Sequence, residues 1–442
     1  MDQKPGFILG IRRPVFWAVL LALGLRLVVV AFVYPDLLTL RRDRWAFGYE
    51  TGRIARSIVQ GHGFSSPLYH PTGPTAWMTP VYPYILAGIF ELFGVYTKAA
   101  AWATLTLNSI FSALTCVPIF YVVRRSFGER VGVWATWAWA VFPYAVYLSA
   151  DFVWDTALST LLVAILLTMT FRLERHAGFG LWMLYGLLWG VTALTNPSVL
   201  TLLPVFGIWA AIRLYRQGER WFLQACAAGL IFFTTLAPWE IRNYRDFHRI
   251  IPLRDSLGLE MWVGNNGDTS TWAVDSSHPS ENPLELAQYE QMGEVAFMAK
   301  KMRQALSFIS SHPGTYAVLV VRRIIYTWTG YWSFARDYLA VEDMDPWNML
   351  MSIPVTIFML LGLRRAFREG KDTAALYAAI IIVYPLIYYI VHPHLRYRHV
   401  IDPYVVALAC YAVVPLPRLT QENSPKDLAE SIPPRARGVS VA

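Results

Sequence analysis

The chain has 442 residues, of which 55% are hydrophobic and only 15% are charged, and its mean hydropathy is +0.38. An average soluble protein has about 25% charged residues, so this composition argues against an ordinary soluble globular protein. The net charge of +8 lies in short links between apolar runs, with no basic face of the kind that binds nucleic acid. Cys116, Cys226 and Cys410 all fall inside apolar runs, which predicts buried thiols and no disulfide framework or zinc site.

Apolar runs recur along the chain. A spanning helix needs roughly 20 mostly apolar residues, and about ten runs approach this length. The first is too long for a signal-peptide core, and no small-residue cleavage site follows it, so we expect a retained helix. The sequence therefore predicts an all-α polytopic membrane protein, with spans near 14–35, 99–123, 131–150, 155–172, 179–195, 197–213, 221–239, 346–363, 373–391 and 400–417.

Basic residues fix the predicted orientation. They follow the second, fourth, sixth and eighth runs: Arg124, Arg125, Arg130, Arg172, Arg175, Arg213, Arg216, Arg220, Arg364, Arg365, Arg368 and Lys371. Under the positive-inside rule these links and both termini are cytoplasmic. The links 36–98, 150–154, 240–345 and 392–399 then face outward, as expected for a multi-pass protein of the plasma or inner membrane.

The predicted organisation has four parts. Residues 1–239 form an N-terminal transmembrane module with a large first outer loop, 36–98. Residues 240–345 form an outer soluble segment with a juxtamembrane helix, and residues 346–419 return to the membrane. Residues 420–442 are polar and proline-containing, which predicts a disordered cytoplasmic tail.

Three segments outside the spans are expected to be helical. Residues 81–94 are apolar but short, which suits an interfacial helix. Residues 315–334 carry two central arginines, which are costly in lipid, so we expect this helix on the outer surface. Helical spacing of apolar residues predicts one amphipathic helix within 285–313, with Leu286, Met292, Val295, Met298, Met302 and Leu306 at that spacing.

The first outer loop holds two candidate catalytic carboxylates, Asp43 and Glu50, beside aromatic residues. Transfer of a sugar to a hydroxyl needs a carboxylate within hydrogen-bond reach of that hydroxyl, to take its proton. The alternative is an ordinary amphipathic helix, with Asp43 as its N-cap and a surface ion pair between Glu50 and Arg53. The spacing alone leaves both interpretations open.

The same loop is rich in arginine and has no lysine near the carboxylates, against the positive-inside bias. Arginine makes planar, bidentate contacts to phosphate. Arg53 and Arg56 are therefore candidates for binding the phosphate of a lipid-linked donor. The alternative is a contact with phospholipid headgroups.

A second outer basic patch lies in HPHLRYRHVIDPY, residues 392–404. Arg396 and Arg398 are candidate phosphate ligands on either side of Tyr397, or else interface anchors. The interleaved prolines and arginines make a poor metal pattern for the histidines. Arg242 either reaches the same site or caps its helix C-terminus. Asp155 either N-caps the fourth span or contributes to acceptor binding.

Four regions together resemble a known family: GYETGRIARSIVQGHGFSSP, PTAWMTPVYPYILAGIFELFG, APWEIRNYRDF with IPLRDSLGLEMWVGNN, and HPHLRYRHVIDPY. They are similar to bacterial members of the GT-C superfamily of membrane glycosyltransferases. The similarity is to the branch that holds the protein O-mannosyltransferases and the lipid A aminoarabinose transferase. It runs from about residue 12 to residue 417, so nearly the whole chain is covered.

This resemblance implies a GT-C bundle with outer juxtamembrane helices, a polyprenyl-phosphate sugar donor and an inverting transfer to a hydroxyl. It implies that an acidic residue of the first outer loop acts as general base. Here that is Asp43 or Glu50, and Glu50 lies in the better-matching stretch. The aminoarabinose transferases carry a lysine before the paired prolines of this loop; this chain has Trp77, Met78 and Thr79 there, which argues against that donor.

On this reading the donor phosphate would meet Arg53, Arg56, Arg242, Arg396 and Arg398. The acceptor pocket would include Tyr49, Trp77, Tyr82, Asp155 and Tyr397. No metal or other cofactor is expected to be required. The alternatives are a flippase or transporter of lipid-linked sugars, which would need a polar path through the bundle, and a scaffold protein of the cell envelope.

Overall fold

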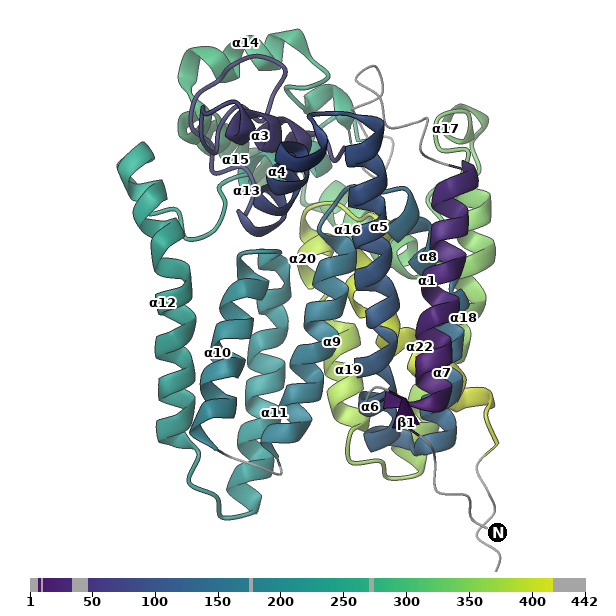
Figure 1. The fold of residues 1–442 in the computed structure, drawn as a ribbon. Coiled ribbons are helices and arrows are strands. Elements are labelled where there is room, and N and C mark those ends of the chain that lie inside the picture. Colours follow the sequence, from purple (N-terminus) through teal and green to yellow (C-terminus); the bar gives the residue numbers. More distant parts are fainter. Residues whose placement is uncertain (1–6, 9–10, 34–46, 175–177, 270–273, 416–442) are drawn as a thin grey trace, which may run out of the picture.

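The computed structural model describes residues 7–8, 11–33, 47–174, 178–269 and 274–415. Within these ranges the chain is almost entirely helical (Figure 1). Two short antiparallel strands, β1 (Phe7–Ile8) and β2 (Ile11–Arg12), precede the first helix. The expected all-α polytopic fold is confirmed. The predicted tail, 420–442, and Asp43 lie outside the described residues.

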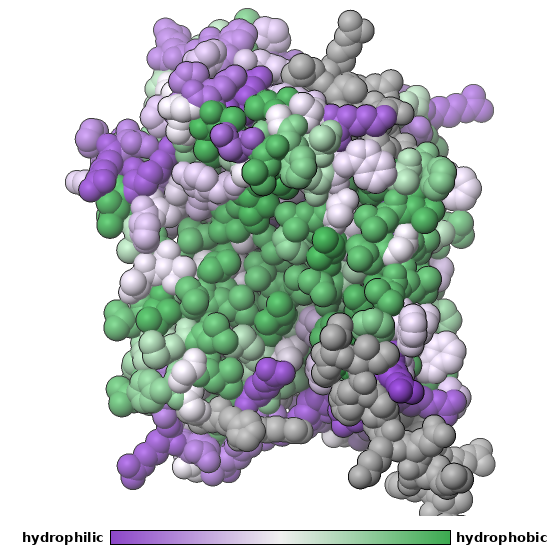
Figure 2. Space-filling model, viewed as in Figure 1, coloured by the Kyte–Doolittle hydropathy of each residue, from purple (hydrophilic) through white to green (hydrophobic). Residues whose placement is uncertain are grey.

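Apolar helices form one layer, with a hydrophobic belt between two polar ends (Figure 2). Six described helices or helix pairs are long and apolar enough to cross a membrane. They are α1 (Arg13–Val33), α5 (Lys98–Leu114) with α6 (Cys116–Phe127), α9 (Thr156–Leu173), η2 (Pro197–Thr201) with α11 (Leu202–Arg216), α12 (Phe222–Phe247) and α18 (Asp345–Arg368). A seventh candidate is the pair α7 (Glu129–Val141) and α8 (Pro143–Ala150), bent by 45°.

The other three predicted spans are shorter helices in the structure. Residues 179–195 contain α10 (Phe179–Ala193), and 373–391 contain α19 (Ala374–Val383) and α20 (Leu386–Ile390). Residues 400–417 contain most of η4 (His399–Ile401) and α22 (Asp402–Val413). Each predicted range therefore falls on a helix, but the tests of length and hydropathy select seven candidate spans among the described residues, not ten.

Arg26, a charged residue inside α1, stabilises the break between α7 and α8. Pro143 has no N–H for the carbonyl of Trp139, four residues earlier. The Arg26 guanidinium donates to the carbonyl of Ala140 at 2.9 Å and lies 3.5 Å from that of Trp139. The arginine is fully buried, and its guanidinium donates to backbone carbonyls at the break.

Glycines allow two helix pairs to pack closely. A Cβ at Gly362 of α18 would lie 1.9 Å from the carbonyl oxygen of Leu408 in α22. A Cβ at Gly186 of α10 would lie 2.2 Å from the carbonyl oxygen of Ala228 in α12. Small residues at such contacts are typical of helix pairs in membranes. Cys226 of α12 is exposed and Cys410 is partly exposed, so of the three predicted buried thiols only Cys116 is fully buried.

Smaller helices gather at one end of the layer, at the top of Figure 1. They are α3 (Glu50–Val59), α4 (Val81–Phe93), α13 (Leu257–Gly264), η3 (Asp275–Ser277), α14 (Pro283–Met292) and α15 (Glu294–Ser311). Nearby are α16 (Pro313–Thr329), α17 (Arg336–Leu339) and α21 (Leu395–Arg398). We call this the pocket end, and the opposite end the arginine end.

Two expectations for the outer segment change in the structure. The single amphipathic helix predicted within 285–313 is two helices, because Gly293 adopts a positive φ of 76° between α14 and α15. In α16, which contains residues 315–329 of the helix predicted over 315–334, Arg323 is fully buried within the protein. Its guanidinium donates to the carbonyls of Gly264 and Ile390 and to the Asn265 side chain, so protein acceptors and not solvent surround it.

Candidate active site

A cavity of about 220 Å³ lies at the pocket end. Segments that are far apart in the sequence form its wall: Tyr49 and Glu50, Trp77–Thr79, Trp154–Thr156, Thr195–Ser198, 254–263, His278 and Glu281, and 387–400. The wall combines carboxylates, arginines, histidines and aromatic rings. This is the composition of a site for a polar ligand with an apolar body.

A strained turn positions Glu50 at the first residue of α3. Gly48 and Tyr49 both have positive φ values, 71° and 53°. A Cβ at Gly48 would lie 2.1 Å from the carbonyl oxygen of Val153, so this position requires glycine. Strain in a non-glycine residue such as Tyr49 persists only where its surroundings enforce it, and such residues concentrate at functional sites. The turn places the carboxylate in the cavity, with 12% of the side chain exposed.

His278 faces this carboxylate. Its Nε2 atom lies 3.4 Å from Oε1 of Glu50, and its Nδ1 atom accepts a hydrogen bond from the Ser280 backbone N–H at 3.1 Å. Because Nδ1 is an acceptor, a neutral ring carries its proton on Nε2, toward Glu50. The imidazole also packs edge-on against the rings of Tyr49 and Trp77.

Burial raises the pKa of Glu50 to about 7, and the nearby charges of Arg53 and Arg396 only partly oppose this shift. Such a carboxyl exchanges a proton readily near neutral pH, which is what a general base requires.

Glu260 of α13 is a second carboxylate in the wall, and its pKa is shifted in the opposite direction to that of Glu50. Burial by itself would raise its pKa, but the hydrogen bond and charge of His392 and the charges of Arg254 and His278 lower it to about 2. The Glu260 Oε2 atom lies 2.7 Å from Nε2 of His392. One cavity thus holds a fixed anion and a carboxyl that titrates near neutrality, a separation that typically assigns different roles to two acids.

Two arginines line the cavity, Arg254 and Arg396. The Arg396 guanidinium lies 3.9 Å from the centre of the Trp154 ring. Its Nη1 atom is buried and makes no hydrogen bond within the described structure. His394, which also lines the cavity, accepts the backbone N–H of Arg396 at 3.1 Å. Burial and the charges of Arg396 and His392 lower the pKa of His394 well below its usual value, so its ring is neutral.

The other predicted phosphate ligands lie outside the cavity wall. Arg53 is 1% exposed and packs 3.8 Å from the centre of the Tyr69 ring, with its guanidinium near Ser280. Arg56 packs against Tyr96. Both lie on α3, behind Glu50.

Arg242 and Arg398 are engaged in the framework. Arg242 donates to the carbonyls of Thr75 and Phe64, both at 2.6 Å, and pairs with Asp246. It therefore ties α12 to the first loop, and does not cap its own helix. Arg398 is 2% exposed, bonded to Asp402 at 2.9 Å and to the Thr327 carbonyl at 2.9 Å.

Most of the predicted acceptor residues do line the cavity: Tyr49, Trp77, Asp155 and Tyr397. Tyr82 does not, since its hydroxyl donates to Asn108 at 3.0 Å in the core beneath α4. Asp155 occupies the N-cap position of α9 without capping a backbone N–H; it accepts a hydrogen bond from the Ser159 hydroxyl at 2.9 Å.

Sequence reasoning did not single out Arg254, Glu260, His278 or Glu281. The first two lie inside the stretch IPLRDSLGLEMWVGNN, which carried part of the family resemblance, so a signal for them existed. His278 and Glu281 lie in a polar loop with no periodicity, and only the fold brings them to α3. Among the described residues, no group of three or more His, Cys, Asp or Glu side chains is arranged to hold a metal ion.

The fold is similar to that of solved GT-C membrane glycosyltransferases, as the sequence resemblance implied. The Archaeoglobus fulgidus oligosaccharyltransferase superimposes with a TM-score of 0.53 at 14% identity, over 90% of this chain and 48% of that one. The same archaeal enzyme, AglB, in complex with an inhibitory peptide and a dolichol-phosphate superimposes with a TM-score of 0.54 at 13% identity, over 90% and 50%. The chain thus spans about half the length of these solved structures.

A family model also matches part of the chain. Residues 70–239, less than half of the chain, are similar to the family described as dolichyl-phosphate-mannose-protein mannosyltransferase. ArnT from Cupriavidus metallidurans, solved with undecaprenyl phosphate, matches at 14% identity with a TM-score of 0.39. The match covers 90% of this chain and 77% of the ArnT chain. No curated protein matches the chain by sequence.

Proposed function

We propose that the protein is an inverting glycosyltransferase that moves a sugar from a polyprenyl-phosphate donor to a hydroxyl of an acceptor, with Glu50 as general base. The observation that carries the proposal is the cavity itself. It places a carboxyl with a pKa near 7 in the same wall as two arginines. The matching family acts on dolichyl-phosphate-mannose by its description, and one solved relative was captured with a dolichol-phosphate.

The reaction needs one proton transfer and one charge to be stabilised. Glu50 takes the proton of the acceptor hydroxyl as its oxygen forms the new bond to the anomeric carbon. The bond from that carbon to the donor phosphate breaks, and its electron pair leaves with the phosphate. Arg254 and Arg396 stabilise the charge of this leaving group, and the buried Nη1 of Arg396 supplies a donor for it. A phosphate is a good leaving group, so no general acid is required.

Aromatic rings give the cavity its affinity for a sugar. Trp77, Trp154, Tyr388 and Tyr397 lie in the wall, and their faces suit the apolar face of a pyranose. Asp155 and Glu281 add acceptors for sugar or substrate hydroxyls. The sugar is a hexose or a pentose, and the acceptor hydroxyl belongs to a protein, a lipid or a glycan. Asp43, the other proposed base, lies outside the described residues.

The test is a transfer assay in liposomes that measures release of free polyprenyl phosphate from polyprenyl-phosphate sugars. Glu50→Gln removes the base and keeps the shape, so we expect release to fall by about 10²-fold or more. Glu91→Gln, on the exposed side of α4, is the matched control and keeps full activity. Full activity in Glu50→Gln together with loss in Asp43→Asn would transfer the role of base to Asp43.

A further inference from the structure

A second cavity, of about 640 Å³, lies at the arginine end, where α6, α9 and α11 finish. Its wall includes Tyr121, Arg124 and Arg125 of α6, Arg172 of α9, and the two residues that follow α9 and α11, Glu174 and Gln217. None of these residues lines the candidate active site, so the cavity calls for its own explanation.

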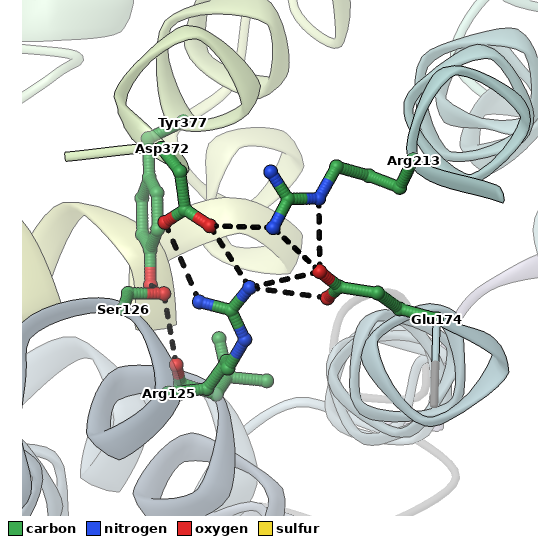
Figure 3. Close-up of polar contacts among 7 residues, drawn as sticks. Arg125, Ser126, Glu174, Arg213, Asp372 and Tyr377 are labelled. Carbon is green, nitrogen blue, oxygen red and sulfur yellow. Dashed lines mark hydrogen bonds and ion pairs between the residues drawn. The ribbon is translucent and has the colours of Figure 1, made fainter. Parts of the chain in front are cut away.

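Part of the charge around this cavity is neutralised internally (Figure 3). Arg125 contacts Glu174 at 3.1 Å and Asp372 at 2.9 Å, and Arg213 contacts the same two carboxylates at 2.6 and 2.9 Å. Two guanidiniums and two carboxylates form a closed ring that joins the ends of α6, α9 and α11 to the start of α19. Arg125 therefore has no charge left for a ligand.

Arg124 and Arg172 are not balanced in this way. The carboxylate that pairs with Arg124 belongs to Glu129, at 3.5 Å, and both side chains are more than 40% exposed, so solvent screens the pair. Arg172 is exposed and forms no ion pair with any described residue. Helix C-termini favour cations, but each contributes only about half a negative charge. The ends of α6 and α9 together therefore offset about one of the two arginines.

The position of the cavity favours a lipid over a soluble anion. Tyr121 and Thr168 lie one helical turn, about 5.4 Å, above the arginines, and Phe171 adds an apolar surface. On the neighbouring α11, Ile212 and Tyr215 are exposed, as expected of a lipid-facing surface. A recess with cations at the helix ends and apolar and hydroxyl groups one turn deeper matches the boundary between phosphate and acyl chain.

We propose that this cavity binds the phosphate headgroup of an anionic phospholipid from the leaflet at the arginine end, with Arg124 and Arg172 as the ligands of the phosphate. The lipid would bridge α6 and α9 beside the charge ring. This proposal does not depend on the transferase activity, and its test needs no donor or acceptor.

The experiment is native mass spectrometry of the full chain in detergent, titrated with phosphatidylglycerol or with phosphatidylcholine. The probe variant is Arg124→Gln with Arg172→Gln, and the matched control is Arg364→Gln with Arg368→Gln, two exposed arginines at the same end of α18. Each arginine near an anionic lipid contributes a few-fold in affinity, so we expect about tenfold weaker phosphatidylglycerol binding in the probe variant. The control binds as the wild type does, and phosphatidylcholine binding is unchanged in both.

Retention of wild-type phosphatidylglycerol binding in the probe variant, or an equal loss in the control, would overturn the proposal. Inorganic phosphate is tested as an alternative ligand in the same titration. If it binds as tightly as the lipid and depends on the same arginines, the site binds soluble phosphate and the lipid assignment fails. If the double variant does not fold, Arg172→Gln alone serves, since that side chain is exposed; about threefold weaker binding is then expected.

Discussion

At the scale of single residues, the pKa of Glu50 sets the expected pH dependence of the reaction. Burial raises this pKa to about 7, so below pH 7 the carboxyl is protonated and cannot accept a proton. We expect kcat/KM to fall about tenfold per pH unit below 7 and to level off above it. A phosphodiester donor stays fully ionised over this range and cannot cause the change. An acidic limb near pH 4.5 would show that an ordinary exposed carboxyl is the base.

Arg396 offers a second test at this scale, because lysine preserves its charge but not its planar geometry. Arg396→Lys loses both the stacking on Trp154 at 3.9 Å and the bidentate fork for a phosphate. We expect KM for the donor to rise about tenfold with a smaller change in kcat. Arg56→Lys, on α3 but outside the cavity wall, is the control. Equal effects of the two substitutions would remove Arg396 from the phosphate site.

At the scale of elements, a buried pair of carboxyls joins the first loop to the outer helices. Glu294, at the start of α15, accepts the Ala76 N–H at 2.5 Å and the Tyr289 hydroxyl at 2.8 Å. Asp255 donates its own N–H to the Ala76 carbonyl at 3.0 Å. Burial and the neighbouring Glu294 carboxyl raise the pKa of Asp255 to about 8. The junction lies directly beside Arg254 of the cavity wall.

This raised pKa gives stability a defined pH dependence. The stabilisation is complete below the unfolded pKa of about 3.9 and is lost as pH rises through about 8. Asp255→Asn stays neutral, so we expect it to raise Tm, and to raise it more at pH 8 than at pH 5. Scanning calorimetry or a thiol-reactive dye reports this, with the exposed Asp268→Asn as control. A gain that does not grow with pH would contradict the raised pKa of Asp255.

Close helix packing is the other element-scale prediction. In Gly362→Ala the new methyl would meet the Leu408 carbonyl oxygen at 1.9 Å, so α18 and α22 must separate. Overpacking of this kind costs about 1–3 kcal/mol, and we expect a lower Tm. Gly207→Ala in α11 has no atom within 4 Å of its new Cβ and serves as control. Equal Tm values for the two variants would mean that the helices yield without cost.

The apolar runs predict where the helices are, because period and hydropathy are local properties of the sequence. They do not predict how helices are interrupted. Gly293 lies within the amphipathic pattern, and the pattern alone does not show that its φ is positive and separates α14 from α15. Likewise, two central arginines in the stretch that forms α16 suggested solvent, whereas Arg323 meets backbone carbonyls from segments about 60 residues away in either direction.

At the scale of the whole molecule, the cavity exists because segments from residue 49 to residue 400 converge at one end of the bundle. Glu50 and Arg396 were accessible to sequence reasoning because charged residues stand out beside apolar runs. His278 was not, because nothing local in its polar loop marks it as the partner of a residue on α3. Arg53 and Arg398 looked equivalent to Arg396 in sequence, but both are buried within the protein and do not line the cavity. Arg398 is bonded to Asp402.

At this scale we also propose that the pocket end faces outward and the arginine end faces the cytoplasm. Starting from a chain without its three native cysteines, Ser276→Cys marks the pocket end and Glu219→Cys the arginine end, both at exposed positions. We expect a membrane-impermeant maleimide to label Ser276→Cys in intact cells and to label Glu219→Cys only after lysis. Phosphate donors reach the active site only from the side on which it opens, so the reverse labelling would place the transfer reaction in the cytoplasm. Labelling of both positions in intact cells would instead indicate a mixed orientation, which the arginines in the short links after the second, fourth, sixth and eighth predicted spans argue against.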